Sequence, residues 1–162
     1  MNNFLKGALA ASLATVSFTT AALAGDWRGW NIHVEDYPVS HGMEAFVAEV
    51  AAKTDGALGG KVFHGGVLGS QPDAIEQVRL GAIDFGVFSL GPMGQVVPEA
   101  NVVSLPFIFK SVPDMSRLMD GEAGAALSAG LEAKGIKALG FYDAGARSFY
   151  NAHKPINTPA EV

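Results

Sequence analysis

Apolar residues in the first part of the chain recur with two different spacings. Over residues 30–34 apolar and polar side chains alternate, which is typical of a half-buried strand and predicts a first β-strand there. A spacing of three and four follows and predicts an amphipathic helix closed by Gly56, with an apolar face of Met43, Phe46, Val47, Val50 and Ala51. Residues 61–64, entered and left through pairs of glycines, predict a weaker second strand.

The most informative segment is the middle of the chain, residues 69–86. Pro72 suits a first helical turn, because its missing N–H would have no helical partner there. Ile75 and Val78 supply an apolar side, and Gly81 can take the left-handed conformation that ends a helix. We therefore expect a helix over residues 72–80 and a buried strand over residues 83–88. Strands that alternate with helices predict an α/β fold, with a mostly parallel sheet flanked by helices and right-handed crossovers.

The order is looser beyond residue 89. Prolines and glycines predict a loop with at most one helical turn over residues 91–98, and the apolar run 105–109 predicts a short extended segment. Within this run, buried packing of Phe107 is favoured over a place along a cleft or hinge. Residues 112–135 predict two helical pieces broken at Gly121. Further strands are expected over residues 136–142 and from residue 147 onward.

The first 24 residues have the features of a secretory signal peptide. Lys6 gives a positive start, an apolar stretch follows, and the sequence Ala-Leu-Ala ending at Ala24 is a cleavage site, so the mature chain is expected to begin at Gly25. The formal charge of −5 becomes more negative when Lys6 is removed, and an acidic export product is a poor candidate for nucleic acid or anionic lipid. No segment reaches the length of a membrane helix, and without cysteine no disulfide can form.

Motifs for metal, phosphate and hydrolytic chemistry are missing from the sequence. The four histidines lack the spacing of metal ligands, and we interpret them as residues of loops and strand ends: His33, His41, His64 and His153. The glycines around residue 66 are followed neither by the Gly-Lys-Ser/Thr of a phosphate loop nor by a dinucleotide fingerprint. No serine lies in a Gly-x-Ser-x-Gly motif.

Two charged side chains are candidates for chemistry, and each has a structural alternative. Asp84 lies in a predicted strand, where an acid is more often hydrogen-bonded to a neighbouring group than catalytic. Arg147 follows Gly145 at a predicted strand start, and its guanidinium can hold a carboxylate through two parallel hydrogen bonds. A structural ion pair, for example with Asp143, is the other interpretation of Arg147.

Four pieces of the chain, in order, resemble a known family. They are a His-x-x-x-x-Pro motif that starts at His33 and residues 63–86, 98–109 and 140–162. Together they resemble the dicarboxylate-binding (DctP) type of solute-binding protein of tripartite ATP-independent periplasmic (TRAP) transporters. The resemblance implies a periplasmic-binding-protein-like fold (type II) of two α/β lobes around a ligand cleft. It implies a periplasmic receptor, without cofactor or catalysis, that captures a small organic acid such as a C4-dicarboxylate or a sugar acid and delivers it to a TRAP permease in the membrane.

The resemblance also implies the ligand contacts. The arginine of the family's Gly-x-Arg motif falls on Arg147. A loop residue shortly after Leu-Gly falls on Gln71, at a helix amino terminus that favours an anion, and the residue three after Asp-Phe-Gly falls on Ser89. The family's first-strand contacts fall near His33 and Glu35.

The sequence departs from the family at its end. In complete relatives a strand with the main ligand-binding arginine, a second lobe and a long helix follow, but this sequence ends at Val162. We therefore expect residues 25–162 to be an N-terminal α/β lobe, cut before the second lobe by a truncated record or gene. The alternatives are a non-binding fragment with exposed strand edges and, with less support, an exported hydrolase that uses Asp84 with His64 or His33.

Overall fold

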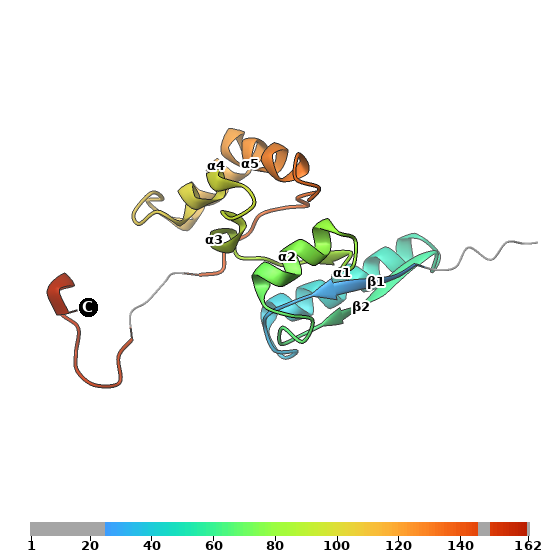
Figure 1. The fold of residues 1–162 in the computed structure, drawn as a ribbon, viewed down its shortest axis with the longest axis horizontal. Coiled ribbons are helices and arrows are strands. Elements are labelled where there is room, and N and C mark those ends of the chain that lie inside the picture. Colours follow the sequence, from blue (N-terminus) through green and yellow to red (C-terminus); the bar gives the residue numbers. More distant parts are fainter. Residues whose placement is uncertain (1–24, 146–149, 162) are drawn as a thin grey trace, which may run out of the picture.

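A parallel sheet organises the N-terminal half of the chain in the computed structural model, which describes residues 25–145 and 150–161 (Figure 1). The strands are β1 (Gly25–Trp30), β2 (Leu58–Phe63) and β3 (Phe85–Gly86), in the order β2-β1-β3. Trp30 lies opposite Phe63 of β2 and opposite Gly86 of β3, so the three strands end at the same edge. The predicted α/β class and parallel sheet are confirmed.

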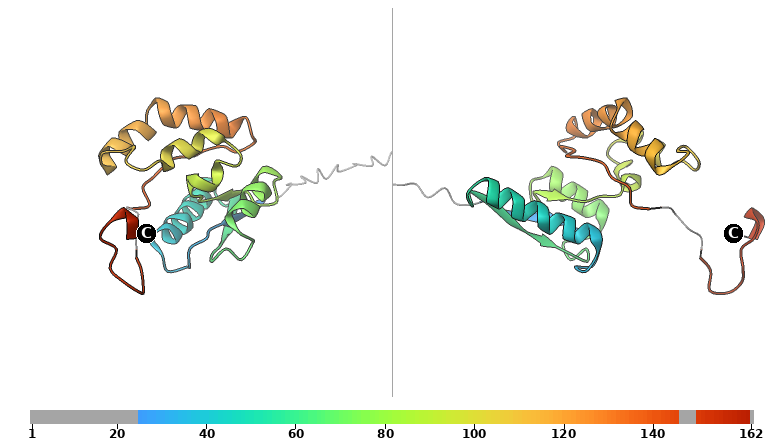
Figure 2. Two further views of the ribbon diagram at one scale, coloured as in Figure 1. Left: turned by 60° about the vertical axis from the view of Figure 1, so that its left-hand side comes forward. Right: turned by 180° about the vertical axis from the view of Figure 1, so that it is seen from behind.

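Each face of the sheet is covered by one helix (Figure 2). α1 (Pro38–Lys53) packs Met43 and Val47 against Val62 of β2. α2 (Gln71–Arg79) packs Ala74 against Trp30 on the other face. Both helices were predicted from their apolar spacing, α2 to within one residue at each end.

A second group of helices follows the sheet (Figure 1) and holds the larger apolar cluster. It consists of α3 (Leu90–Met93), a 3-10 helix (Pro98–Ser104), α4 (Val112–Met119) and α5 (Glu122–Glu132). Its core includes Ile75 of α2 together with Leu127 and Leu131 of α5, so the two groups of helices share apolar contacts. The predicted break at Gly121 is confirmed, because Gly121 is the residue before α5.

The first two strands begin earlier than predicted. The prediction of a strand at residues 30–34 is wrong, because β1 ends at Trp30. The chain leaves the sheet at Asn31, whose buried side chain donates to Ser40 Oγ in α1 (2.7 Å). β2 begins at Leu58 and includes a pair of glycines that we expected before the strand. The second of them, Gly60, has no room for a side chain, because a Cβ would lie 2.7 Å from the Cβ of Trp27 in β1.

The segments around residues 83–109 differ in part from the prediction. The strand expected at residues 83–88 is reduced to the two residues of β3, since β1 offers no further strand residues beyond Trp30. The loop expected at residues 91–98, with at most one helical turn, is confirmed, because α3 has four residues and turns follow it. The chain then enters a 3-10 helix, and Met93, Val97 and Ala100 lie on the apolar core. Phe107, expected to be buried in an extended run, lies in a turn with a φ of 62° and is 99% exposed.

The expected strand at residues 136–142 is also absent from the structure. Ile136 is buried against the helices and Leu139 is 77% exposed. Phe141 also packs against the core, however, while Tyr142 is exposed, so the alternation of a strand is not kept beyond residue 139. Within the described ranges no other segment pairs with residues 136–142 as a strand, so these residues remain irregular. The predicted signal peptide and residues 147–149 of the last predicted strand lie outside the described residues. Within residues 25–145 and 150–161, no helix has both the length and the apolar character needed to cross a bilayer.

Candidate functional site

The segments that follow β1 and β2 are tied together at the carboxyl edge of the sheet. Gly66 N donates to Asn31 O (2.9 Å), and Gly65 N donates to His33 O (2.7 Å). Ligands of open α/β sheets bind outside the carboxyl ends of the strands, so this edge is the candidate site.

Trp30 connects the end of β1 to the segments that follow the other two strands. Its Nε1 donates to Gly69 O (3.0 Å), which fixes the loop in front of α2. Its fully buried indole is stacked on Phe88, with 5.0 Å between the ring centroids, and Phe88 precedes the predicted site residue Ser89. A single buried side chain therefore sets the spacing between the loops of the site.

Gln71 and Ser89, both predicted as ligand contacts, are in direct contact. Gln71 Nε2 donates to Ser89 O (2.8 Å). Gln71 is the first residue of α2, whose amino terminus carries a partial positive charge. An amide keeps a second N–H and an oxygen acceptor, and a serine hydroxyl both donates and accepts, so the pair can serve a polar ligand.

The amino terminus of α2 is held by its own side chains. Asp73 Oδ2 accepts from Ser70 N (3.2 Å) and from Ser70 Oγ (2.6 Å), which links the residue before the helix to its first turn. Such bonds satisfy amide groups that have no partner inside the helix. Gln71 is therefore presented from a fixed helix end.

His33 and Glu35 lie in the segment that follows β1, at the same edge of the sheet. The His33 ring is stacked on the ring of Tyr37, with 4.2 Å between centroids and 15° between planes. Glu35 is exposed, and its carbonyl oxygen accepts from Tyr37 N (3.0 Å). Four of the five predicted contact residues thus lie in segments that follow the carboxyl ends of the strands, and their role in binding a ligand stays a prediction.

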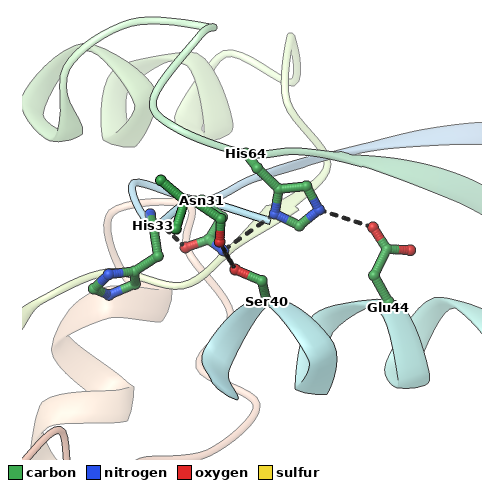
Figure 3. Close-up of polar contacts among 6 residues, drawn as sticks. Asn31, His33, Ser40, Glu44 and His64 are labelled. Atoms are coloured by element: carbon green, nitrogen blue, oxygen red, sulfur yellow. Dashed lines mark hydrogen bonds and ion pairs between the residues drawn. The ribbon is translucent and has the colours of Figure 1, made fainter. Parts of the chain in front are cut away.

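A polar cluster beneath this segment was not predicted (Figure 3). Asn31 Nδ2 donates to Ser40 Oγ (2.7 Å) and lies 3.4 Å from His64 Nδ1. His64 Nε2 lies 2.9 Å from Glu44 Oε1 of α1. The sequence did hold a signal for Ser40, which lies three residues before the buried Met43 on the apolar face of α1.

Arg147, the predicted carboxylate ligand, lies outside the described residues. The preceding segment is described as far as Gly145, which has a φ of 88° that favours glycine. Burial raises the pKa of the Tyr142 hydroxyl in this segment.

The structural interpretation of Asp84 is confirmed. Asp84 Oδ2 accepts from Arg28 N in β1 (2.7 Å), so its carboxylate continues the bonding of the sheet. His64, its proposed partner in a hydrolase, contacts Glu44 instead. Nowhere in residues 25–145 and 150–161 do three or more metal-ligating side chains gather into a possible metal site.

Comparison with known proteins identifies close relatives along most of the chain. A family model described as bacterial extracellular solute-binding protein, family 7, matches residues 31–162. A solute-binding protein of Chromohalobacter salexigens is 52% identical over 155 residues, which are 96% of this chain and 46% of that protein.

Two crystal structures of TRAP periplasmic solute-binding proteins have similar folds. The protein from Sulfitobacter sp. NAS-14.1, with bound β-D-galacturonate, is 78% identical with a TM-score of 0.82 over 84% of this chain and 45% of that one. The protein from Roseobacter denitrificans, with bound β-D-glucuronate, is 62% identical with a TM-score of 0.81 over the same shares. The chain spans about half the length of these relatives.

Proposed function

The chain belongs to bacterial extracellular solute-binding protein family 7, and from this premise we propose that it is part of a periplasmic receptor for hexuronates. The receptor captures the sugar acid and delivers it to the membrane permease of a TRAP transporter. Relatives that are 78% and 62% identical hold galacturonate and glucuronate, which supports a hexuronate over a C4-dicarboxylate. The relatives are named as solute-binding proteins, so we propose binding without catalysis.

One observation carries the proposal. The hydrogen bond from Gln71 Nε2 to the main-chain oxygen of Ser89 joins these two polar residues at the carboxyl edge of a parallel sheet, beside the amino terminus of α2. A hexuronate has one carboxylate and several hydroxyls, so it needs many neutral donors and acceptors and few charges. Gln71 and Ser89 supply neutral groups, and we assign to Arg147 a contact with the carboxylate, since a guanidinium matches it with two parallel hydrogen bonds. This contact adds to that of the main ligand-binding arginine, which is expected beyond Val162.

We propose further that this chain supplies the amino-terminal lobe of the receptor. Its relatives are about twice as long, and ligand pockets enclose most of the ligand surface, which one lobe cannot do. Residues 1–24 serve as the signal peptide that sends the receptor to the periplasm.

The test uses the full-length gene product that carries this chain. Isothermal titration with D-galacturonate, D-glucuronate and succinate is expected to give tight binding of a uronate and weak binding of succinate. Arg147→Ala is expected to weaken uronate binding by roughly 1.5–3 kcal/mol, the value of a hydrogen bond to a charged group. Arg79→Ala is the matched control, because Arg79 pairs with Glu76 at the carboxyl end of α2, away from the site.

The proposal is overturned if none of the uronates binds, or if the two arginine variants bind them equally well. Binding of succinate in preference to both uronates would leave a receptor but refute the hexuronate assignment. A purified chain of residues 25–162 that binds uronate as tightly as the full-length protein would refute the two-lobe proposal.

A further inference from the structure

The polar cluster at the carboxyl edge contains two side chains that are entirely buried, Asn31 and Ser40, each 0% exposed. They lie where the segment after β1 passes over the first turn of α1, and His64 closes the cluster from the end of β2 (Figure 3). Buried polar groups are costly unless they are hydrogen-bonded, so the arrangement of donors and acceptors here is constrained.

The direction of each hydrogen bond follows from the partners. Ser40 Oγ donates its proton to Val34 O (2.7 Å), so its lone pairs accept from Asn31 Nδ2 (2.7 Å). Asn31 Oδ1 accepts from His33 N (3.1 Å). A flipped Asn31 amide would set its NH₂ group against the His33 N–H, so a single orientation satisfies both neighbours.

His64 and Glu44 fit the same orientation. The second proton of Asn31 Nδ2 points to His64 Nδ1 (3.4 Å), which makes Nδ1 the acceptor and leaves the ring proton on Nε2. Nε2–H then donates to Glu44 Oε1 (2.9 Å). The imidazole and carboxylate therefore support the Asn31 amide from the side opposite the loop.

The result is a backbone held at three successive points. His33 N is bound by Asn31 Oδ1, His33 O by Gly65 N, and Val34 O by Ser40 Oγ. We propose that Asn31 and Ser40 are positioning residues that act as a clamp on residues 33–34 and thereby present His33 and Glu35 to the sugar acid. The clamp rests on the proposed function for its ligand, but its effect on the loop can be measured without one.

The principal variant is Ser40→Ala, with Thr54→Val as its matched control. Thr54 also bonds α1 to neighbouring backbone through a hydroxyl, donating to Val50 O (2.8 Å) and accepting from Leu58 N (3.0 Å), but it lies where β2 begins, at the other end of the strands. Both changes are expected to lower the melting temperature of the full-length protein. Only Ser40→Ala is expected to raise the Kd for D-galacturonate, by about tenfold, because a loosened loop is binding-competent for a smaller fraction of the time.

Amide hydrogen exchange gives the readout that does not need a ligand. Ser40→Ala is expected to speed exchange at the His33 and Gly65 amides selectively, whereas Thr54→Val leaves them protected. If the native protein binds uronate but the Ser40→Ala and Thr54→Val variants have equal Kd values, the clamp is overturned and the proposed function is not. A native protein that binds no uronate overturns the proposed function and with it the positioning of a ligand. Exchange that is unchanged in Ser40→Ala overturns the clamp in either case.

A second variant, Asn31→Asp, keeps the size of the side chain and tests the direction of the bonds if Ser40→Ala fails to fold. The new carboxylate sets an acceptor against the lone pairs of Ser40 Oγ and against His64 Nδ1, where the Asn31 amide donated. The variant is therefore expected to raise the Kd for galacturonate several-fold. An unchanged Kd would refute the proposed orientation, and so the clamp.

Discussion

The loop in front of α2 depends on a glycine that tolerates no side chain. Gly69 has a φ of 123°, a conformation that residues with a Cβ rarely adopt. A Cβ at Gly69 would lie 3.2 Å from the Cβ of Asp73 and 3.4 Å from Gln77 Nε2. Asp73 holds Ser70, and Gln77 donates to Leu68 O (2.8 Å), so neither neighbour can move freely.

The cost of Gly69→Ala follows from these two effects. The backbone conformation costs an alanine about 1–3 kcal/mol. Displacement of Asp73 weakens the cap of α2, which is worth about 0.5–2 kcal/mol. We therefore expect a loss of about 1.5–5 kcal/mol in the free energy of unfolding. Gly56→Ala is the matched control, because Gly56 has a φ of 77° but no atom within 4 Å of the added Cβ, and about 1 kcal/mol is expected.

Urea unfolding of the full-length protein and of both variants, followed by circular dichroism, measures this difference. Gly69→Ala is also expected to weaken uronate binding, because Gln71 lies two residues away, whereas Gly56→Ala is expected to leave it unchanged. The reasoning is refuted if the variant at Gly69 is no less stable than the variant at Gly56.

Three further predictions concern other parts of the fold. Gly124→Ala is expected to lower the free energy of unfolding by about 1–3 kcal/mol, because the added Cβ would clash with the main chain at the end of α4. Gly42→Ala is expected to raise it by up to about 1 kcal/mol, because the added Cβ meets open space in α1. Urea unfolding that ranks the two variants otherwise would contradict this. The hydrogen bond from Arg117 holds the pKa of the Asp114 carboxyl below its usual value. The ionised carboxylate therefore stabilises the fold at pH values above the unfolded pKa of about 3.9, and this stabilisation is lost as the pH falls through the lower pKa of the folded state. Asp114→Asn should therefore remove part of the acid sensitivity in unfolding measured against pH, and an unchanged profile would count against the ion pair. Asp84→Ala is expected to cost about 1 kcal/mol of stability without changing uronate affinity, and a large loss of binding in calorimetry would return Asp84 to the list of site residues.

The helices that flank the sheet could be predicted because their signals are local. The spacing of Met43 and Val47 marks the buried face of α1, and Pro72 and Gly81 mark the ends of α2. Strands carried less local information. Residues 136–139 alternate between buried or half-buried and exposed side chains, but a strand also needs a neighbouring backbone, and no alternation of side chains reveals whether one is present.

The candidate site could be predicted only in part. Gln71, Ser89, His33 and Glu35 came from family motifs, and the structure places all four after strand ends. The clamp residues could not be found in this way, because Asn31 interrupts what looked like a continuous strand. Its partners Ser40 and His64 are 9 and 33 residues away, and only the fold brings them together.

The buried contact between Trp30 and Phe88 also makes the protein an optical reporter of its own state. An indole that is stacked and shielded from water emits at shorter wavelength than one in solvent, and its intensity depends on the ring beside it. Trp30 is fully buried, whereas Trp27, the other tryptophan of the sequence, is partly exposed. Since Phe88 is bonded directly to Ser89, we expect a ligand that contacts Ser89 to shift the stacked rings and change the emission of Trp30. Trp30 emission would then report occupancy of the proposed site in real time, without any attached dye.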